Sequence, residues 1–281
     1  MKKSINAWTF PNEYSFRDCL AAARDAGFDA VEFNLDADGR SEHSFYLSTT
    51  DDEILAVRAL CEEYGITPVS VSSSLHSGLW SRLEPETVER SRAILTAQLN
   101  IAKLLGADTI LLVPGGMRDG MRLDEARKNS IANLKAVEPI IRASGVKVGL
   151  ENVWNGFFLS PYDMMSFLDE LDPELFGLYY DLGNMVAFSD TIHWTEIVAP
   201  RALKIHIKDY KRNGGINRGG RFCQLLEGDV DFEGAMALLR AAGFDGYLTA
   251  EVSRDDESVA WSDYFASISK AEDKIIEFYN K

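Results

Sequence analysis

The chain has 281 residues, of which 46% are hydrophobic and 26% are charged, and this composition is typical of a globular protein. Asp and Glu number 44 against 29 Lys and Arg, and the resulting net charge of −15 repels nucleic-acid phosphates, so we expect no nucleic-acid partner. No run of about 18 apolar residues occurs, so the sequence indicates neither a membrane span nor a signal peptide.

Strand-like and helix-like segments alternate along the first half of the chain. A glycine follows each expected helix, at Gly27, Gly65, Gly106 and Gly145, and supplies the left-handed turn that commonly ends a helix. The segment 50–53, Thr-Asp-Asp-Glu, has the spacing of a capping box and predicts a helix start. We expect strands at 5–10, 30–35, 66–72, 109–113 and 146–151, and helices at 15–25, 50–64, 85–105 and 123–144.

The same alternation continues through the second half. Strands are expected at 177–181, 202–209 and 247–251, and a final helix at 261–279. The phrase Arg-Asp-Ala-Gly-Phe-Asp at 24–29 recurs as Arg-Ala-Ala-Gly-Phe-Asp at 240–245, each time between a helix and a strand. Eight strands joined by helices and mostly short connections predict an α/β fold, a single (β/α)8 TIM barrel over residues 1–281. An open doubly wound sheet is the alternative, but no glycine-rich phosphate loop follows the first strand.

The three cysteines, Cys19, Cys61 and Cys223, are odd in number, far apart and without the spacing of a metal site. The sequence therefore predicts packing residues in a reduced, cytoplasmic compartment. The oligomeric state is left open, and a homo-oligomer is compatible with the sequence.

Four of the expected strands end in a residue that can bind a metal: Glu151, Asp181, His206 and Glu251. In a TIM barrel the C-terminal ends of the strands meet at one rim, so these side chains would converge there. Carboxylates in such number repel each other unless a cation lies among them. An oxygen-rich set suits Mn²⁺, Mg²⁺, Fe²⁺ or Co²⁺ better than a structural zinc. We interpret the four as a divalent metal site, the alternative being four separate salt-bridged strand ends.

The motifs around these residues resemble the xylose isomerase-like superfamily, in particular its sugar phosphate isomerase/epimerase branch. The resemblance covers nearly the whole chain, and a departure is Leu226, where the branch usually has the first glycine of a Gly-x-Gly-x-(Val/Ile)-Asp-Phe phrase. The motifs are Leu-Glu-Asn-Val at 150–153, Tyr-Asp-Leu-Gly-Asn at 180–184, His-Ile-Lys-Asp at 206–209, Ala-Glu-Val at 250–252 and Glu-Gly-Asp-Val-Asp-Phe at 227–232.

The resemblance implies a metal-dependent isomerase or epimerase that acts on a small keto sugar or sugar derivative. One divalent ion, often manganese, would be held by the four strand-end residues, with Mg²⁺, Co²⁺, Fe²⁺ and Zn²⁺ left open. In the ketose 3-epimerases of this group the metal binds the carbonyl, and two glutamates lie on opposite sides of the carbon that exchanges its proton. The resemblance gives these catalytic roles to Glu151 and Glu251.

Two departures bear on the substrate. The epimerases usually have a second glutamate where this chain has Phe157, and a histidine where it has Asn184. Both positions normally handle substrate hydroxyls, so the sugar or its ring position is expected to differ. A lyase, either an inosose-type dehydratase or an enzyme that cleaves a carbon-linked glycoside, is therefore the alternative. An abasic-site endonuclease would need more histidines and a basic face, and a noncatalytic sugar-binding protein is the remaining class.

Further residues are candidates for substrate binding. Lys208 shares the inward parity of His206 and could bind a substrate oxygen or phosphate, or form an ion pair. The others are Asn184, Asp209, Trp8 and Trp154 just past strand ends, Glu32 as site wall or salt bridge, and His76 as pocket or surface residue. We expect His43 and His193 on the surface.

The segment 210–229 is the longest irregular stretch at the expected rim. It has a basic cluster, Lys211, Arg212, Arg218 and Arg221, among glycines. The sequence predicts either a lid that closes over an anionic sugar, with Arg218 binding substrate, or a solvated flexible loop.

Overall fold

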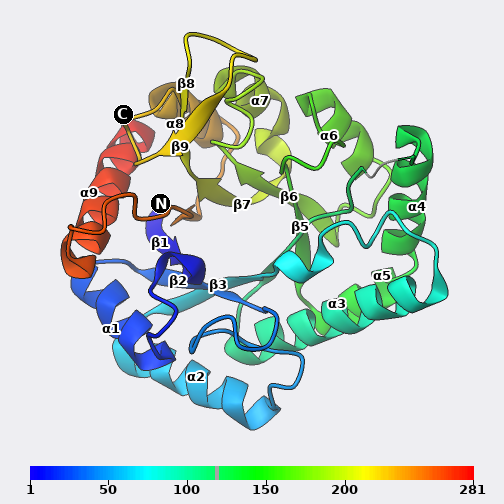
Figure 1. Ribbon diagram of the computed structural model, residues 1–281, viewed down its shortest axis with the longest axis horizontal. Coiled ribbons are helices and arrows are strands. Elements are labelled where there is room, and N and C mark those ends of the chain that lie inside the picture. Colours follow the sequence, from blue (N-terminus) through cyan, green and yellow to red (C-terminus); the bar gives the residue numbers. More distant parts are fainter. Residues whose placement is uncertain (118–119) are drawn as a thin grey trace.

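The protein, a computed structural model described over residues 1–117 and 120–281, forms a closed barrel of eight parallel strands within this part of the chain (Figure 1). Each strand pairs with the next in sequence, and the last pairs with the first, so the barrel closes. The predicted (β/α)8 fold is confirmed. The strands are β1 (Lys2–Asn6), β2 (Ala30–Asn34), β3 (Thr67–Ser72), β4 (Thr109–Leu112), β5 (Lys147–Glu151), β6 (Phe176–Asp181), β7 (Ala202–Ile207) and β10 (Tyr247–Ala250).

Helices form a ring around the barrel (Figure 1). The predicted capping box is confirmed, because Thr50 and Glu53 exchange side-chain to backbone hydrogen bonds. Gly27, Gly65 and Gly106 adopt the left-handed conformation after their helices, as predicted. The helices are α1 (Phe16–Ala26), α2 (Asp51–Tyr64), α3 (Pro85–Leu105), α4 (Leu123–Lys135), α5 (Glu138–Ser144), α6 (Pro161–Leu168), α7 (Thr191–Val198), α8 (Phe232–Ala241) and α9 (Trp261–Asn280), with short 3₁₀ turns η1 (Ala7–Thr9), η2 (Ser74–His76) and η3 (Ala199–Arg201).

Two predicted boundaries are wrong for local reasons. The first strand ends at Asn6, not at residue 10, because the Asn6 side chain accepts a hydrogen bond from the Trp8 amide and caps η1. The helix predicted over 123–144 is divided into α4 and α5. Pro139 stands in the first turn of α5, where its missing N–H costs nothing, whereas inside a continuous helix it would remove a hydrogen bond and clash with the preceding turn.

The segment predicted to be irregular contains a β-hairpin. Its strands, β8 (Asp209–Arg212) and β9 (Gly220–Cys223), pair antiparallel above the barrel rim (Figure 1). The strand predicted over 202–209 is correspondingly divided, since β7 ends at Ile207 and Lys208 lies between β7 and β8. The long connection therefore has a defined structure in its two arms.

The barrel interior is polar beneath the rim. Tyr179 of β6 and Ser70 of β3 lie 3.0 Å apart through their hydroxyls, and these strands are not neighbours, so both side chains point inward. A Cβ on Gly149 would lie 3.0 Å from the Cβ of Tyr179, so glycine makes room for this ring. Gly149 lies two residues before Glu151 in β5, so both residues face the barrel interior.

The burial of His43, His193 and the three cysteines can be compared with their predicted positions. His43 is buried, which contradicts its predicted surface position, because its ring lies within hydrogen-bond distance of the Tyr14 and Ala7 carbonyl oxygens. His193 is exposed, as predicted. Of the cysteines, Cys19 and Cys61 are buried packing residues, whereas Cys223 is half-buried in β9.

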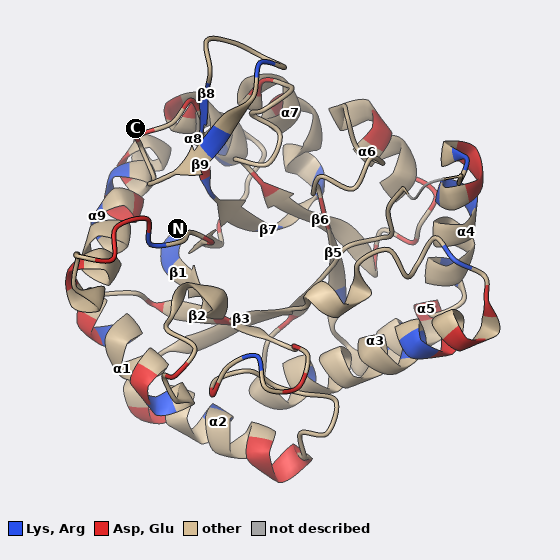
Figure 2. Ribbon diagram, in the orientation of Figure 1, with Lys and Arg blue, Asp and Glu red and all other residues tan. Residues whose placement is uncertain are grey.

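Charged residues of both signs are distributed over the outer helices (Figure 2). In residues 1–117 and 120–281, the helices are too short or too polar to cross a membrane.

Glu272 of α9 predicts a pH-dependent stability. The residue is fully buried, and among the described residues its side-chain oxygens have no hydrogen-bond partner. Burial raises its pKa well above the usual range, so the folded chain keeps a proton that the unfolded chain loses above about pH 4.3. Stability should therefore fall as pH rises.

Glu272→Gln cannot ionise, so we expect its melting temperature at pH 8 to exceed that of the wild type. The increase should be roughly 2–4 °C for each kcal/mol by which the buried carboxyl destabilises the wild type at that pH. The difference should shrink toward pH 5 when both proteins are followed by circular dichroism. Glu277→Gln, an exposed change on the same helix, is the matched control. A difference between Glu272→Gln and wild type that is constant with pH would contradict this explanation.

Candidate active site

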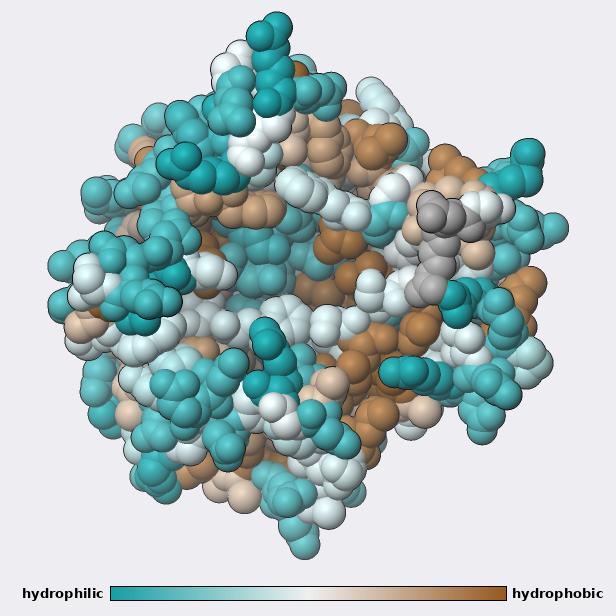
Figure 3. All heavy atoms as spheres, viewed as in Figure 1, coloured by the Kyte–Doolittle hydropathy of each residue, from teal (hydrophilic) through white to brown (hydrophobic). Residues whose placement is uncertain are grey.

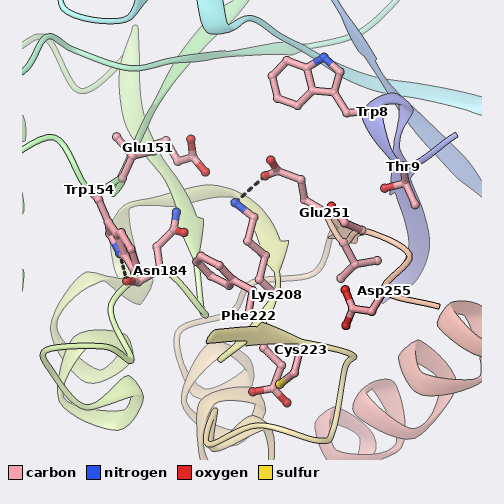
Figure 4. A pocket seen from close by; sticks show the side chains of 14 residues that line it. Trp8, Thr9, Glu151, Trp154, Asn184, Lys208, Phe222, Cys223, Glu251 and Asp255 are labelled. Atoms are coloured by element: carbon pink, nitrogen blue, oxygen red, sulfur yellow. Dashed lines mark hydrogen bonds and ion pairs between the residues drawn. The ribbon is translucent and has the colours of Figure 1, made fainter. Parts of the chain in front are cut away.

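The four predicted strand-end residues meet at the rim of the barrel. Glu151 and Asp181 end β5 and β6, His206 is in β7, and Glu251 follows β10. One ligand atom from each lies within 4.8 Å of the others. Figure 4 shows Glu151 and Glu251 reaching toward each other from opposite sides. The structure thus brings together the residues that the sequence predicts to converge.

His206 is fixed between the cluster and a buried carboxylate. Its Nδ1 faces the cluster, 3.3 Å from Glu151 Oε1 and 3.0 Å from Glu251 Oε2. Its Nε2 donates to Glu32 Oε2 at 2.5 Å, and Asn6 Nδ2 donates to the same oxygen at 2.9 Å. Burial alone would lower the pKa of His206, but the Glu32 carboxylate raises it well above the usual range. Glu32 therefore sets the orientation of the imidazole.

Asp181 is held by its own strand end. Its Oδ1 accepts hydrogen bonds from the amides of Gly183 and Asn184, at 2.8 and 2.7 Å. The side chain of Asn152 bonds both the N–H and the C=O of Asp181, each at 2.8 Å. This role of Asn152 was not predicted from the sequence, although Asn152 directly follows Glu151 in the Leu-Glu-Asn-Val motif. These bonds leave Asp181 Oδ2 directed at the cluster.

Lys208 adds a positive charge to the cluster. Its Nζ lies 3.1 Å from Asp181 Oδ2. It lies 2.9 Å from Glu251 Oε2, an ion pair that Figure 4 marks with a dashed line. Burial alone would raise the pKa of Glu251, but Lys208 and His206 lower it to about 2. For Glu151 burial dominates and raises the pKa. Lys208 therefore points inward, as predicted, and it forms the ion pair that the sequence left as an alternative to substrate binding.

The donor set fits a divalent cation. Three carboxylates and one imidazole nitrogen converge, which is a set that Mn²⁺ or a similar ion accepts. The other nitrogen of His206 donates to the Glu32 carboxylate, as the second nitrogen of metal-bound histidines commonly does. Asp181 Oδ2 is buried, and its partner among the described residues is Lys208 Nζ at 3.1 Å, so this oxygen faces the cluster. The residues present therefore suit a metal centre.

A cleft opens directly above the cluster, in the hollow at the centre of the rim (Figure 3). Its volume is about 430 Å³. Trp154 is half exposed there, stacks on Phe222 with ring centroids 5.5 Å apart, and donates through Nε1 to the Asn184 carbonyl at 2.5 Å. Trp8 donates to both Asp36 oxygens at 3.1 Å. Five of the predicted substrate residues line this cleft: Trp8, Trp154, Asn184, Lys208 and Asp209.

Two predicted substrate residues, Asp209 and His76, are held by hydrogen bonds within the protein. Asp209 accepts from the amides of Tyr210, Gly228 and Val230, so its carboxylate is occupied by the backbone. His76 was predicted as a pocket or surface residue, and both are wrong, because it is fully buried outside the cleft and its ring bonds Gln98 at 2.8 Å. Burial lowers its pKa to about 4.

Glu32 and Phe157 do not line the cleft. Glu32 is fully buried beneath His206 and pairs with it, so of the two predicted roles, site wall or salt bridge, the structure shows the salt bridge. Phe157, which stands where the epimerases usually have a glutamate, packs against Phe158 and Phe167 in the core.

The basic cluster of the hairpin segment is mostly bound to the protein itself. Lys211 pairs with Asp229 at 2.8 Å, and Arg212 donates to the carbonyls of Val186 and Ser189. Arg218 and Arg221 are exposed, and neither lines the cleft. The hairpin instead contributes Phe222 and Cys223 to the wall.

Comparisons with known proteins agree with this fold. The family described as xylose isomerase-like TIM barrel matches residues 20–273. The L-ribulose-5-phosphate 3-epimerase UlaE of Salmonella paratyphi C (strain RKS4594) is 26% identical over 259 residues, covering 90% of this chain and 86% of that protein. The structure of the IOLI protein with a binding zinc atom has a TM-score of 0.82 at 16% identity and covers 99% of both chains. That of L-ribulose 3-epimerase has a TM-score of 0.77 at 20% identity and covers 99% of this chain and 94% of the other.

Proposed function

The chain belongs to the xylose isomerase-like TIM barrel family, and from this premise we propose that it is a divalent-metal-dependent isomerase or epimerase of a small keto sugar or sugar derivative. The curated relative is named as a 3-epimerase of a ketose phosphate, which supports this class of enzyme. The metal ligands would be Glu151, Asp181, His206 and Glu251. Manganese is our first choice because carboxylates dominate the donor set, and zinc is included because the IOLI structure contains it.

The observation that carries the proposal is the placement of two glutamates on either side of one centre. Glu151 and Glu251 both approach His206 Nδ1, at 3.3 and 3.0 Å. Figure 4 shows the two carboxylates reaching toward each other from opposite sides of the pocket. A sugar carbon above this centre would present one face to each carboxylate. One glutamate can then remove a proton and the other can return one, which is the requirement for inverting a carbon.

The remaining residues would bind and orient the sugar. When bound, a divalent metal polarises the sugar carbonyl and makes the neighbouring C–H more acidic. Lys208 would donate to a substrate oxygen, and the Asn184 side chain would bond a hydroxyl, since both line the cleft. Trp8 and Trp154 would pack on the C–H faces of the ring and exclude water.

A lyase is the second candidate. It is favoured by Phe157, because the side chain that replaces the usual glutamate is buried in the core and cannot handle a hydroxyl. The same proton removal, followed by loss of water or of an aglycone, would give a different product. Product analysis separates the two, since an isomer supports the epimerase and a dehydrated or cleaved product supports the lyase.

The test begins with metal content. Wild-type protein loaded with Mn²⁺ should retain about one ion per chain after dialysis, and Glu151→Gln and His206→Ala should lose it. A panel of keto sugars incubated with the loaded wild type in D₂O should then show deuterium at a carbon next to the carbonyl by NMR. Metal retention without exchange would reject the isomerase and favour the lyase. Wild type that binds no divalent ion would reject the site.

The hairpin gives a prediction about the lid. Arg218→Ala with Arg221→Ala is expected to change KM and kcat for the exchanging sugar by less than about twofold, because both side chains are exposed and outside the cleft. Phe222→Ala is the matched comparison in the same hairpin. It should raise KM, because Phe222 forms part of the cleft wall and stacks on Trp154. A large rise in KM in the arginine variant would instead support a lid that closes over an anionic sugar.

A further inference from the structure

The cleft continues into a second compartment on the side of β3, β4 and β5. This compartment has a volume of about 590 Å³ and shares Trp8, Glu151, Val153, Trp154 and Glu251 with the first. We propose that it binds a non-reacting, uncharged part of the substrate, such as an aglycone or a second sugar ring. The substrate would then be a keto sugar that carries such a group in place of a phosphate. This inference rests on the proposed function, because it places the reacting carbon between Glu151 and Glu251.

The size of the cleft motivates the proposal. The first compartment alone, at about 430 Å³, falls in the range of about 300–1,000 Å³ in which small molecules bind. The second compartment adds space that a monosaccharide held at Glu151 and Glu251 does not need. Ligand-sized space that is continuous with the reacting centre suits a second group on the same molecule.

The lining of the second compartment decides its chemistry. Apart from the three cluster residues Glu151, His206 and Glu251, the described residues that line it have no charged side chain. The wall is formed by apolar Leu111, Val113 and Met117, together with hydroxyls from the segment 73–77. In Figure 3 this side of the hollow is largely hydrophobic. Burial against such a wall stabilises the binding of an apolar group. A phosphate there would lie near carboxylates, and the described residues of the wall offer it no cationic partner.

The first compartment is also a poor phosphate site. Among the described residues that line this compartment, the cationic side chain is that of Lys208. The Lys208 ammonium lies 3.1 Å from Asp181 and 2.9 Å from Glu251. Its charge is therefore shared with two carboxylates. Among the described residues that line the two compartments there is no arginine, whose fork of N–H donors phosphates commonly use.

The floor of the second compartment is built by two loops that hold each other. Met117 N donates to the Asn155 carbonyl at 2.9 Å, and Asn155 Nδ2 donates to the Gly115 carbonyl at 3.1 Å. Ser81 Oγ donates to the Gly116 carbonyl at 3.0 Å. These bonds tie the loop after β4 to the loop after β5. The compartment is consequently present before substrate arrives, which lowers the ordering cost of binding.

The experiment uses three probes with the same reacting carbonyl and different attached groups. They are phenyl 3-keto-β-D-glucoside, 3-keto-D-glucose and 3-keto-D-glucose 6-phosphate. Binding to Mn²⁺-loaded wild type is measured by calorimetry, and deuterium exchange is followed by NMR. We expect the phenyl glycoside to bind at least tenfold more tightly than the free sugar. The phosphate ester should bind no better than the free sugar.

Ser74→Trp is designed to fill the second compartment from its exposed edge, and Ser48→Trp is the matched control outside the cleft. Ser74→Trp should weaken binding of the phenyl glycoside at least tenfold and that of the free sugar less than twofold, and Ser48→Trp should change neither. Preference for the phosphate ester, or an equal effect of Ser74→Trp on both neutral probes, would overturn the proposal. Because binding is measured separately from exchange, absence of exchange with normal binding rejects the proposed reaction and leaves the compartment supported.

Discussion

Glu251→Gln is expected to abolish epimer formation and to lower the rate of deuterium exchange of one of the two epimers about 10²–10⁴-fold, the range over which a positioned acid or base contributes. Glutamine keeps the shape of the side chain but cannot accept the substrate proton. Glu251 Oε2 lies at the centre of the cluster, 3.0 Å from His206 Nδ1 and 2.9 Å from Lys208 Nζ. Exchange and epimer formation are measured by NMR in D₂O with Mn²⁺ in excess.

Excess metal matters because Glu251 is also a proposed metal ligand, and the metal content of each sample is therefore measured beside its rate. Glu227→Gln, an exposed change in the segment after the hairpin, is the matched control and should keep the wild-type rate. Glu151→Gln should also abolish epimer formation. If the two glutamates serve opposite faces, each variant should retain exchange of a different epimer. Variants that keep full epimerase activity with metal bound would contradict the assignment.

The sequence was sufficient for the fold because its strongest signals are local. Each barrel strand has a run of β-forming residues, and glycines such as Gly65 and Gly106 end the helices before them. The errors arise where one side chain overrides the local pattern. Asn6 caps a short 3₁₀ turn inside an apolar run, and Pro139 divides a helix whose periodicity is continuous. The β8–β9 hairpin was not predicted because its arms are only four residues long and mostly polar, and the connection between them is rich in glycine.

The convergence of Glu151, Asp181, His206 and Glu251 was predictable because four barrel strands have ligand-type residues at their ends and a closed barrel brings such ends together. The supports of the cluster were not. Glu32 contacts His206 across 174 residues of sequence, and only the closure of the barrel places β2 and β7 face to face across the interior. Asn152 acts on the backbone of Asp181 from the neighbouring strand. Such contacts depend on register and depth, which a sequence pattern does not give.

The contact between Glu32 and His206 has a direct consequence for metal binding. A histidine binds a metal through a nitrogen that has no proton, so Nδ1 can be a ligand only when the proton is on Nε2. The Glu32 carboxylate, 2.5 Å from Nε2, favours that tautomer. Asn6 holds the carboxylate in place with a bond of 2.9 Å. The charge on Glu32 is therefore part of the proposed metal site although the residue does not reach the cleft.

Glu32→Gln is expected to lower Mn²⁺ affinity about 10–100-fold, the usual effect of removing such a partner. The glutamine amide can present an N–H to Nε2, which shifts the proton to Nδ1 and blocks the ligand position. Equilibrium dialysis gives the affinity, and ¹⁵N NMR of the His206 ring in the metal-free protein, at a pH high enough to remove one ring proton, gives the tautomer. Glu42→Gln, an exposed change on the loop after β2, should alter neither.

The NMR measurement distinguishes orientation of His206 from a general structural effect. A destabilised barrel would lower the melting temperature and the affinity without moving the proton, whereas loss of the carboxylate should move the proton in a folded chain. Glu32→Asp keeps the charge on a shorter side chain, so we expect it to restore the Nε2–H tautomer and part of the affinity. Wild-type affinity in folded Glu32→Gln, or reduced affinity with the proton still on Nε2, would exclude Glu32 as the group that positions His206.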